Sequence, residues 1–225
     1  MRRLLLLLLC VSLLPLPAGA ADASQYVALT FDDGPSGRFT RALLEGLEDR
    51  NARATFLLCG YRMEQYPELV TQILDGGHEI GIHGYSHKCM GKMCADALVR
   101  EIDRCRGLLP EGCQPVFLRP PGGILNNAVR QVAKDAGLAI LSWSVDPRDW
   151  ATAQAGAVEA AVLNAVKDGD VVLLHDMSNS SVEAALAIVD ALQARGFLLV
   201  TASELAAARQ ITPKAGVVYA RFPFG

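Results

Sequence analysis

Regular alternation of short apolar segments with amphipathic ones is the strongest constraint on this fold. Strands are expected at residues 26–31, 54–58, 79–82, 116–118, 138–143, 170–174 and 197–200. Helical periodicity is expected between them, at 39–48, 68–74, 94–109, 126–136, 158–166 and 182–194, with a last helix from Ser203. Strands that alternate with helices pair in parallel, so the sequence predicts a single-domain α/β fold. About seven such units indicate a barrel related to the eightfold one.

The N-terminus has the pattern of a secretory signal peptide. Arg2 and Arg3 form a basic start, residues 4–14 are apolar, and residues 18–20 read Ala-Gly-Ala, an A-x-A cleavage pattern. The apolar run is about half the roughly 20 residues that span a bilayer, so an uncleaved anchor is the less favoured alternative. We therefore expect a signal peptide at 1–20, a mature domain at 21–225 with its core at about 25–205, and a secreted or cell-envelope location.

Charge and hydropathy exclude two broad classes of protein. Loss of two arginines with the signal leaves 19 of 21 basic residues against 24 acidic ones, a net charge of −5. This chain therefore lacks the basic excess that binding to a nucleic-acid backbone requires. The mean hydropathy of +0.24 would suit a membrane protein. Much of it comes from residues 4–14 and from the expected buried strands, and no later run is long enough to span a membrane.

Five cysteines remain after the expected loss of Cys10. An exported protein permits disulfides, and an odd number leaves one thiol over. The candidates for two bridges are Cys89, Cys94, Cys105 and Cys113, with Cys59 unpaired. The spacing leaves their connectivity open, and we expect the bridges to brace a long surface segment. A zinc site is the alternative, but no CxxC pair supports it.

Polar residues gather at the carboxyl ends of the expected strands, where a parallel barrel has its active site. Five strand ends carry them in turn: Asp32 and Asp33, His83 and His87, Arg119, Asp146 and Asp149, and His175 with Asp176. Ordinary surface residues would be scattered over both rims. The pattern therefore predicts one site that combines carboxylates, imidazoles and a guanidinium.

Two histidines four residues apart suggest a metal site. With one carboxylate, His83 and His87 form a His₂-Asp set, which suits zinc and leaves a coordination position open. The alternative is two unrelated histidines, because an H-x-x-x-H pair alone is a weak signal. Residues 78–83 resemble the H-E-x-x-H motif of zinc proteases but have one residue too many, so we interpret His78 as structural or as a support for the metal ligands.

The adjacent carboxylates Asp32 and Asp33 lie in a tight Gly-Pro turn. Like charges at this distance disfavour ionisation of both groups unless each has a partner. One carboxylate binding a metal and the other taking a proton from water would resolve the conflict. A solvated turn is the alternative, since Asp-Asp-Gly-Pro is common in turns.

Five short motifs occur in order: TFDDGP at 30–35, HGYSH at 83–87, RPPG at 119–122, DPRDW at 146–150 and LLH at 173–175. Together they resemble the five motifs of the polysaccharide deacetylases, carbohydrate esterase family 4, over about residues 25–205. One departure is Gly84, where the family usually has Ser or Thr. The resemblance implies a distorted (β/α)₇ barrel and makes residues 21–225 a polysaccharide deacetylase catalytic domain.

Roles follow from the resemblance, motif by motif. It implies Asp33, His83 and His87 as metal ligands, Asp32 as general base and His175 as general acid. It implies that Arg119 pairs with Asp32 and that Asp146 orients His175, with Asp149 the less favoured candidate. The implied lining of the groove at the acetyl group is Trp150 and Leu173. Pro121 and Gly122 are further substrate-binding candidates, because backbone N–H groups of their glycine-rich turn could complete an oxyanion hole. The implied metal is Zn²⁺, with Co²⁺ or Ni²⁺ as possible substitutes.

The implied activity is hydrolysis of N-acetyl, and sometimes O-acetyl, groups on peptidoglycan or chitin-like amino sugars. The expected partner is an acetylated polysaccharide or oligosaccharide, and we expect a monomer. One alternative is a metal-dependent hydrolase of cyclic amides or ureides on the same barrel, a class that is usually cytoplasmic. Another is a non-catalytic carbohydrate-binding relative, which would lack the base or the acid that this chain has.

Overall fold

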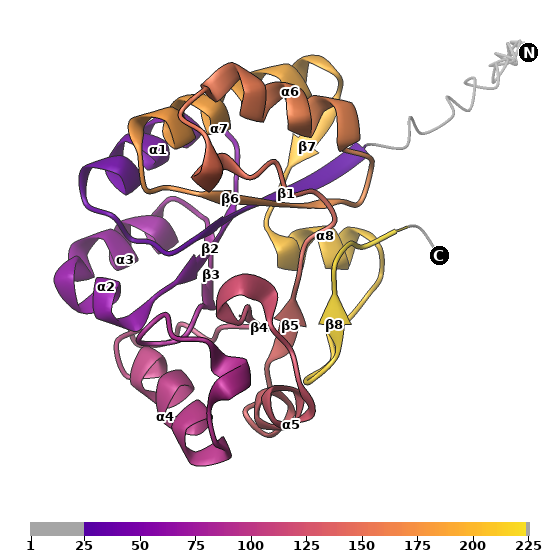
Figure 1. Ribbon diagram of the computed structural model, residues 1–225. Helices are drawn as coiled ribbons and strands as arrows, with labels where there is room; N and C mark the ends of the chain where they lie inside the picture. Colours follow the sequence, from indigo (N-terminus) through magenta and orange to yellow (C-terminus); the bar gives the residue numbers. More distant parts are fainter. Residues whose placement is uncertain (1–24, 224–225) are drawn as a thin grey trace, which may run out of the picture.

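A curled parallel sheet organises the chain, in a computed structural model that describes residues 25–223 (Figure 1). The predicted signal peptide at 1–20 lies outside these residues. Across the described range, no helix is both long enough and apolar enough to cross a membrane.

Eight strands form the sheet: β1 (Gln25–Asp32), β2 (Thr55–Leu58), β3 (Glu79–Ile82), β4 (Phe117–Leu118), β5 (Ala139–Leu141), β6 (Val171–His175), β7 (Phe197–Leu199) and β8 (Val218–Tyr219). Their order is β6-β1-β2-β3-β4-β5-β8, and all of these pairs are parallel. Strand β7 pairs only with the first residues of β1. After β5 the chain returns to β6, where the N–H of Leu173 donates to the carbonyl of Val145 at 2.9 Å and helps to close the curl.

Seven helices flank the sheet on its outer side: α1 (Arg38–Glu48), α2 (Gly60–Gln65), α3 (Pro67–Asp75), α4 (Ala95–Arg106), α5 (Asn127–Asp135), α6 (Ala155–Ala165) and α7 (Asn179–Ala194). Helix α8 (Ala202–Ala208) instead packs against inward-facing residues of the strands, among them Ala28 and Leu57. Three 3₁₀ turns lie between them: η1 (Met90–Lys92), η2 (Pro121–Gly123) and η3 (Asp149–Ala151). The prediction of an α/β domain of parallel strands is confirmed. The sequence missed α2 and β8, and it extended α4 by three residues beyond Arg106.

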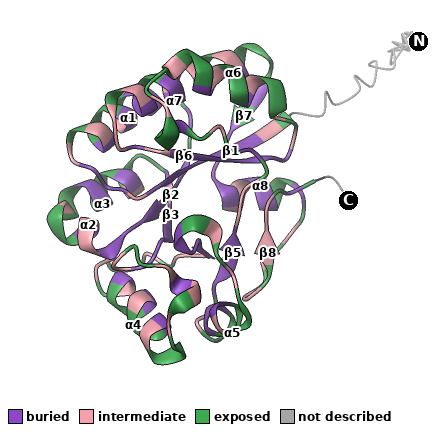
Figure 2. Ribbon diagram, in the orientation of Figure 1, coloured by how far each residue is buried: buried purple, intermediate pink, exposed green. Residues whose placement is uncertain are grey.

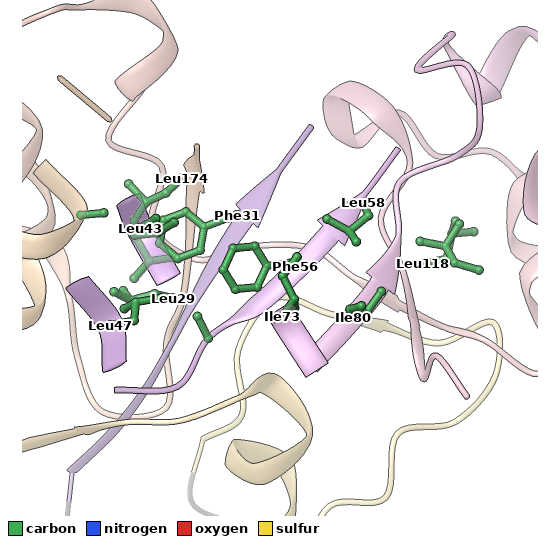
Figure 3. Packing of buried hydrophobic residues seen from close by; sticks show 14 of the residues in the cluster. Leu29, Phe31, Leu43, Leu47, Phe56, Leu58, Ile73, Ile80, Leu118 and Leu174 are labelled. Carbon is green, nitrogen blue, oxygen red and sulfur yellow. The ribbon is translucent and has the colours of Figure 1, made fainter. Parts of the chain in front are cut away.

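The main core lies between the sheet and the helices that cover it. Alternate residues of β1, among them Leu29 and Phe31, face α1, and the ring of Phe31 stacks on Phe56 of β2 at 5.3 Å (Figure 3). Strands are buried along most of their length, whereas the outer faces of the helices are exposed (Figure 2). Since side chains alternate across a strand, the intervening residues Thr30 and Asp32 face the inside of the curl.

The expected disulfides are absent from this structure. All five cysteines in the described residues are free thiols. Cys105 is buried in the core on the inner face of α4, whereas Cys94 is exposed just before the same helix. The structure therefore shows neither of the two predicted bridges among Cys89, Cys94, Cys105 and Cys113.

Candidate active site

The carboxyl end of β1 places two adjacent carboxylates differently. Asp32 is the last residue of β1 and only 3% exposed. Asp33 follows in the left-handed region, at φ 73°. This reversal turns the second carboxylate away from the direction that strand alternation would give it. The two acids therefore serve different neighbours.

Asp32 is paired with a completely buried guanidinium. The Nη1 of Arg119 donates to Asp32 Oδ1 at 2.6 Å and to the hydroxyl of Thr30 at 2.8 Å. Its Nε and Nη2 donate to the carbonyls of Leu141 and Ser142, each at 2.9 Å. Every guanidinium nitrogen thus has an acceptor, as a buried charge requires. Asp32 keeps its second oxygen, Oδ2, which lies 3.7 Å from His83 Nε2.

Asp33, His83 and His87 converge on one point. Asp33 Oδ1 lies 2.9 Å from His87 Nε2 and 3.3 Å from His83 Nε2. The ligand atoms of the three residues all lie within 4.8 Å of one another. His83 is buried with its side chain 2% exposed, whereas that of His87 is 43% exposed, so the cluster opens to solvent on one side.

This cluster fits a divalent cation. His83 Nδ1 lies 2.7 Å from the carbonyl of Arg119, which can only accept, so a neutral His83 presents the lone pair of Nε2 to Asp33. Asp33 Oδ1 is itself buried and has no hydrogen bond. A carboxylate and two imidazoles whose lone pairs converge are a donor set that suits zinc.

On the opposite side of the site, His175 at the end of β6 is held by Asp149. His175 Nδ1 lies 2.8 Å from Asp149 Oδ1, and its backbone N–H donates to Asp149 Oδ2, also at 2.8 Å. Burial lowers the pKa of His175, but the hydrogen bond and charge of Asp149, with the charges of Asp32 and Asp33, raise it overall. The ring therefore keeps its proton to a higher pH than an isolated imidazole.

The prediction that Asp146 orients His175 is wrong. Asp146 is exposed, and its Oδ1 accepts the backbone N–H of Arg148 at 2.9 Å. Arg148 has the left-handed conformation, φ 56° and ψ 45°, and so reverses the chain between the two acids. That turn buries Asp149, at 3% exposure, against His175. Asp149, the less favoured candidate in the sequence, therefore orients His175 in place of Asp146.

Another carboxyl, Asp176, fixes the turn that carries Asp33. Asp176 is completely buried, and its Oδ2 accepts the hydroxyl of Thr40, which in turn accepts the N–H of Ser36 at 2.7 Å. The hydroxyl of Ser36 donates to the carbonyl of Asp176. A Cβ on Gly34 would lie 3.0 Å from Asp176 Oδ1, so this close approach requires glycine. Burial raises the pKa of Asp176 to about 6.

Comparison with known proteins agrees with this geometry. A family model described as polysaccharide deacetylase matches residues 19–141, more than half of the chain. The chain belongs to the polysaccharide deacetylase family. It is 40% identical over 185 residues to a peptidoglycan-N-acetylglucosamine deacetylase of Bacillus cereus, covering 80% of this chain and 87% of that protein. It is 32% identical over 198 residues to a chitooligosaccharide deacetylase of Rhizobium leguminosarum bv. trifolii, covering 81% and 91%.

Solved structures extend the likeness to the second half of the chain. A family 4 acetyl xylan esterase of Clostridium thermocellum, in complex with cobalt, superposes with a TM-score of 0.82 at 30% identity and covers 88% of this chain and 100% of that one. Some curated relatives are longer, and the chain spans 40% of the peptidoglycan deacetylase PgdA of Listeria monocytogenes. This deacetylase thus shares the family fold across nearly all its described residues.

A cleft of about 550 Å³ lies beside the groups of the candidate site. Asp33, Asp149 and His175 line it together with Trp150, whose side chain is among the most exposed large apolar groups, at 60%. Pro121, Gly122 and Leu173, the other predicted groove residues, do not line this cleft, and Leu173 is buried within β6. The sequence missed several lining residues: Thr152, Met177, Ser178, Ser180 and Ser181. The serines belong to the start of α7, which the sequence placed three residues later.

A larger groove, of about 690 Å³, lies at the other end of the strands between α1 and α3. The motif residues do not line it. His78 does, and its Nδ1 accepts the N–H of Ala54 at 3.2 Å. Burial lowers the pKa of His78 to about 4, so it is neutral at physiological pH. These contacts agree with a structural role for His78.

Proposed function

We propose that this deacetylase is a metal-dependent, exported enzyme that removes N-acetyl groups from peptidoglycan or its fragments. The observation that carries the proposal is the convergence of three groups on one cleft. A His₂-Asp cluster lies beside a carboxylate with one free oxygen, and a histidine held by Asp149 faces them. Amide hydrolysis needs a polarised carbonyl, a base for the attacking water and an acid for the leaving nitrogen.

Asp33, His83 and His87 would hold the metal ion, and Zn²⁺ fits their donor set, with Co²⁺ or Ni²⁺ able to substitute. Bound there, the ion would polarise the acetyl carbonyl and acidify a water molecule. The one-sided exposure of the cluster at His87 leaves room for the acetyl group to approach.

Asp32 acts as the general base through Oδ2. Its Oδ1 is engaged by Arg119, so the free oxygen points toward the cluster, 3.7 Å from His83 Nε2. Arg119 fixes the rotation of the carboxylate, and the base therefore does not have to reorganise before it accepts the proton of the attacking water. Asp32 lies beside the metal cluster and is not one of its ligands, so it is free to act as the base.

His175 acts as the general acid through Nε2. Asp149 accepts from Nδ1, which fixes the ring and leaves Nε2 facing the cleft. The raised pKa of His175 keeps a proton on the ring near neutral pH, where it can be donated to the leaving amine. Because base and acid are both present, a non-catalytic carbohydrate-binding role is disfavoured.

Peptidoglycan is favoured as substrate by the Bacillus cereus relative, which acts on that polymer and matches this chain over 87% of its length. Chitooligosaccharides and acetylated xylan, named for the Rhizobium relative and the Clostridium structure, are the alternatives. The amino-terminal pattern at 1–20 supports export to the compartment that holds such polymers. Export also argues against a cytoplasmic ureide hydrolase.

One assay tests the activity and the substrate together. The purified enzyme is incubated with peptidoglycan, chitin oligomers or acetylxylan, and released acetate is measured before chelation, after chelation and after Zn²⁺ is restored. We expect release from peptidoglycan that chelation abolishes and Zn²⁺ restores. Release from none of the polymers, or release that chelation leaves unchanged, contradicts the proposal. N-terminal sequencing of protein secreted by a bacterial host tests export, and we expect the mature chain to begin at residue 21.

A further inference from the structure

A single side chain of α4 fastens the loop that carries both histidines of the metal cluster. Glu101 Oε2 accepts the backbone N–H of Ser86 at 2.7 Å, and Glu101 Oε1 accepts the hydroxyl of Ser86 at 2.8 Å. Both distances are those of well-formed hydrogen bonds. Ser86 directly precedes His87, so the fastening is one peptide away from a proposed ligand.

His87 needs this support more than His83 does. His83 is buried, and its Nδ1 is fixed by the carbonyl of Arg119. His87 is 43% exposed and has the left-handed conformation, at φ 55°. For a non-glycine residue that conformation is unfavourable and persists only where the surroundings impose it. The two hydrogen bonds of Glu101 to Ser86, here called the clamp, are available to hold this conformation.

Gly84 allows the carboxylate to come this close. Its φ is +81°, and a Cβ at this position would lie 3.2 Å from Glu101 Oε2. A side chain here would be strained and would press against the clamp. Gly84 is also the one departure from the family pattern in this motif. Its missing side chain leaves the space in which the Glu101 carboxylate lies.

Glu101 is well placed to act as a fixed anchor. Its helix α4 is held in the core by Leu98, Ile102 and Cys105. The neighbouring Arg104 lies over the ring of Tyr85, 3.2 Å from its centroid, so the helix grips the loop at a second residue. Because α4 is held in place, the Glu101 carboxylate holds Ser86 at a fixed position relative to the core.

We propose that Glu101 is a positioning residue that orients His87 toward the bound metal ion. It acts through Ser86 and touches neither the substrate nor the metal. The inference rests on the proposed metal-dependent function and assigns to that site a support outside the five motifs. Its loss releases the turn at His87, so the metal is held by two well-placed ligands and one mobile one.

The test is direct measurement of metal affinity. Zn²⁺ binding to the purified protein is measured by competition with a chromophoric chelator for wild type, Glu101→Ala and Glu101→Gln. We expect Glu101→Ala to bind Zn²⁺ roughly 10- to 100-fold more weakly, the range typical for partners of metal ligands. Glu101→Gln keeps one acceptor oxygen, so its Zn²⁺ affinity should lie between those of wild type and Glu101→Ala. The matched control is Glu111→Gln, an exposed glutamate in the loop after α4, which should bind as wild type.

A second readout follows ligand geometry without turnover. The visible absorption of the Co²⁺-loaded protein should change in Glu101→Ala and not in Glu111→Gln, because a displaced imidazole alters the coordination of the ion. At saturating Zn²⁺, kcat of Glu101→Ala should recover to within a few-fold of wild type, since the base and the acid are untouched.

Wild-type affinity and spectrum in Glu101→Ala would overturn the inference while leaving the proposed function intact. A wild-type protein that binds no metal would overturn both. If Glu101→Ala does not fold, as judged by circular dichroism, Glu101→Gln and Ser86→Ala carry the test. Ser86→Ala removes one of the two hydrogen bonds, and its effect should be less than additive with that of Glu101→Gln. Unchanged affinity in both of these variants would equally refute the role.

Discussion

Replacement of Asp176 by Asn should stabilise the protein at neutral pH and have a much smaller effect at pH 4. Asp176 is completely buried, and burial raises its pKa from 3.8 to about 6, against the opposing hydrogen bond from Thr40. In the unfolded chain the carboxyl ionises near 3.8, whereas in the fold it stays protonated until about pH 6. Stability attributable to this group is therefore lost as pH rises from about 4 to 6, and the loss is complete above that range.

The magnitude follows from the separation of the two pKa values. Each unit corresponds to ~1.4 kcal/mol, so the rise to about 6 costs the fold about 3 kcal/mol at pH 7. Asn cannot ionise and avoids this cost, while its carbonyl can still accept the hydroxyl of Thr40. Any change in packing or hydrogen bonding shifts the free energy of unfolding by the same amount at every pH. The change of that free energy with pH therefore reports only the ionisation of Asp176.

The assay is urea denaturation of both proteins from pH 4 to pH 8, with chelator in every sample so that metal binding contributes to neither. The free energy of unfolding of Asp176→Asn minus that of wild type should rise by about 2.5 kcal/mol between pH 4 and pH 7, since a small part of the cost is already present at pH 4. Asp75→Asn, at an exposed carboxyl at the end of α3, is the matched control and should give a nearly flat difference. A flat difference for Asp176→Asn as well would refute the reasoning.

Three other substitutions, with Asp146→Asn as a control, separate the roles within the site. Asp32→Asn should keep Zn²⁺ bound and lower kcat by at least 10²-fold, because only the base is lost; near-normal acetate release would exclude Asp32 as base. His83→Ala should lose Zn²⁺, so metal analysis of the purified variant should find well under one ion per chain, and a full complement would remove His83 from the ligand set. Asp149→Asn removes the partner that raises the pKa of His175, so the basic limb of the kcat/KM profile should shift to lower pH and kcat should fall. Asp146→Asn, at the exposed acid of the same loop, should leave that profile unchanged, and equal effects of the two variants would contradict the assignment of Asp149.

Much of the fold follows from hydrophobic patterning. Strand β3 was predicted at its observed bounds, and the outward and inward alternation of β1 accounts for the direction of Asp32. Strand β4 has only two residues and was predicted because a proline-rich turn marks its end. Helix α2 was missed because its six residues, 60–65, are too few to show a helical period.

The limits of the sequence are set by backbone conformation and by long-range contacts. Asp146 and Asp149 occupy the same loop, and only the left-handed turn at Arg148 decides which of them reaches His175. Glu101 carries no motif signal, because its partner Ser86 is 15 residues away and the bond depends on how α4 packs. The cysteines show the same limit, since burial of Cys105 in the core is a tertiary property.

The hydrogen bonds of Arg119 have a consequence for redesign of this enzyme. One guanidinium connects β1, through Thr30 and Asp32, with the end of β5, through Leu141 and Ser142. The guanidinium of Arg119 that orients Asp32 thus also links two strands inside the sheet. Lysine cannot reproduce its planar set of donors. Substitution of Arg119 to shift the pH optimum would therefore lower the stability of the fold and disturb the orientation of Asp32 together. The side of the cleft at Asp149 and His175 is where the two can be tuned separately.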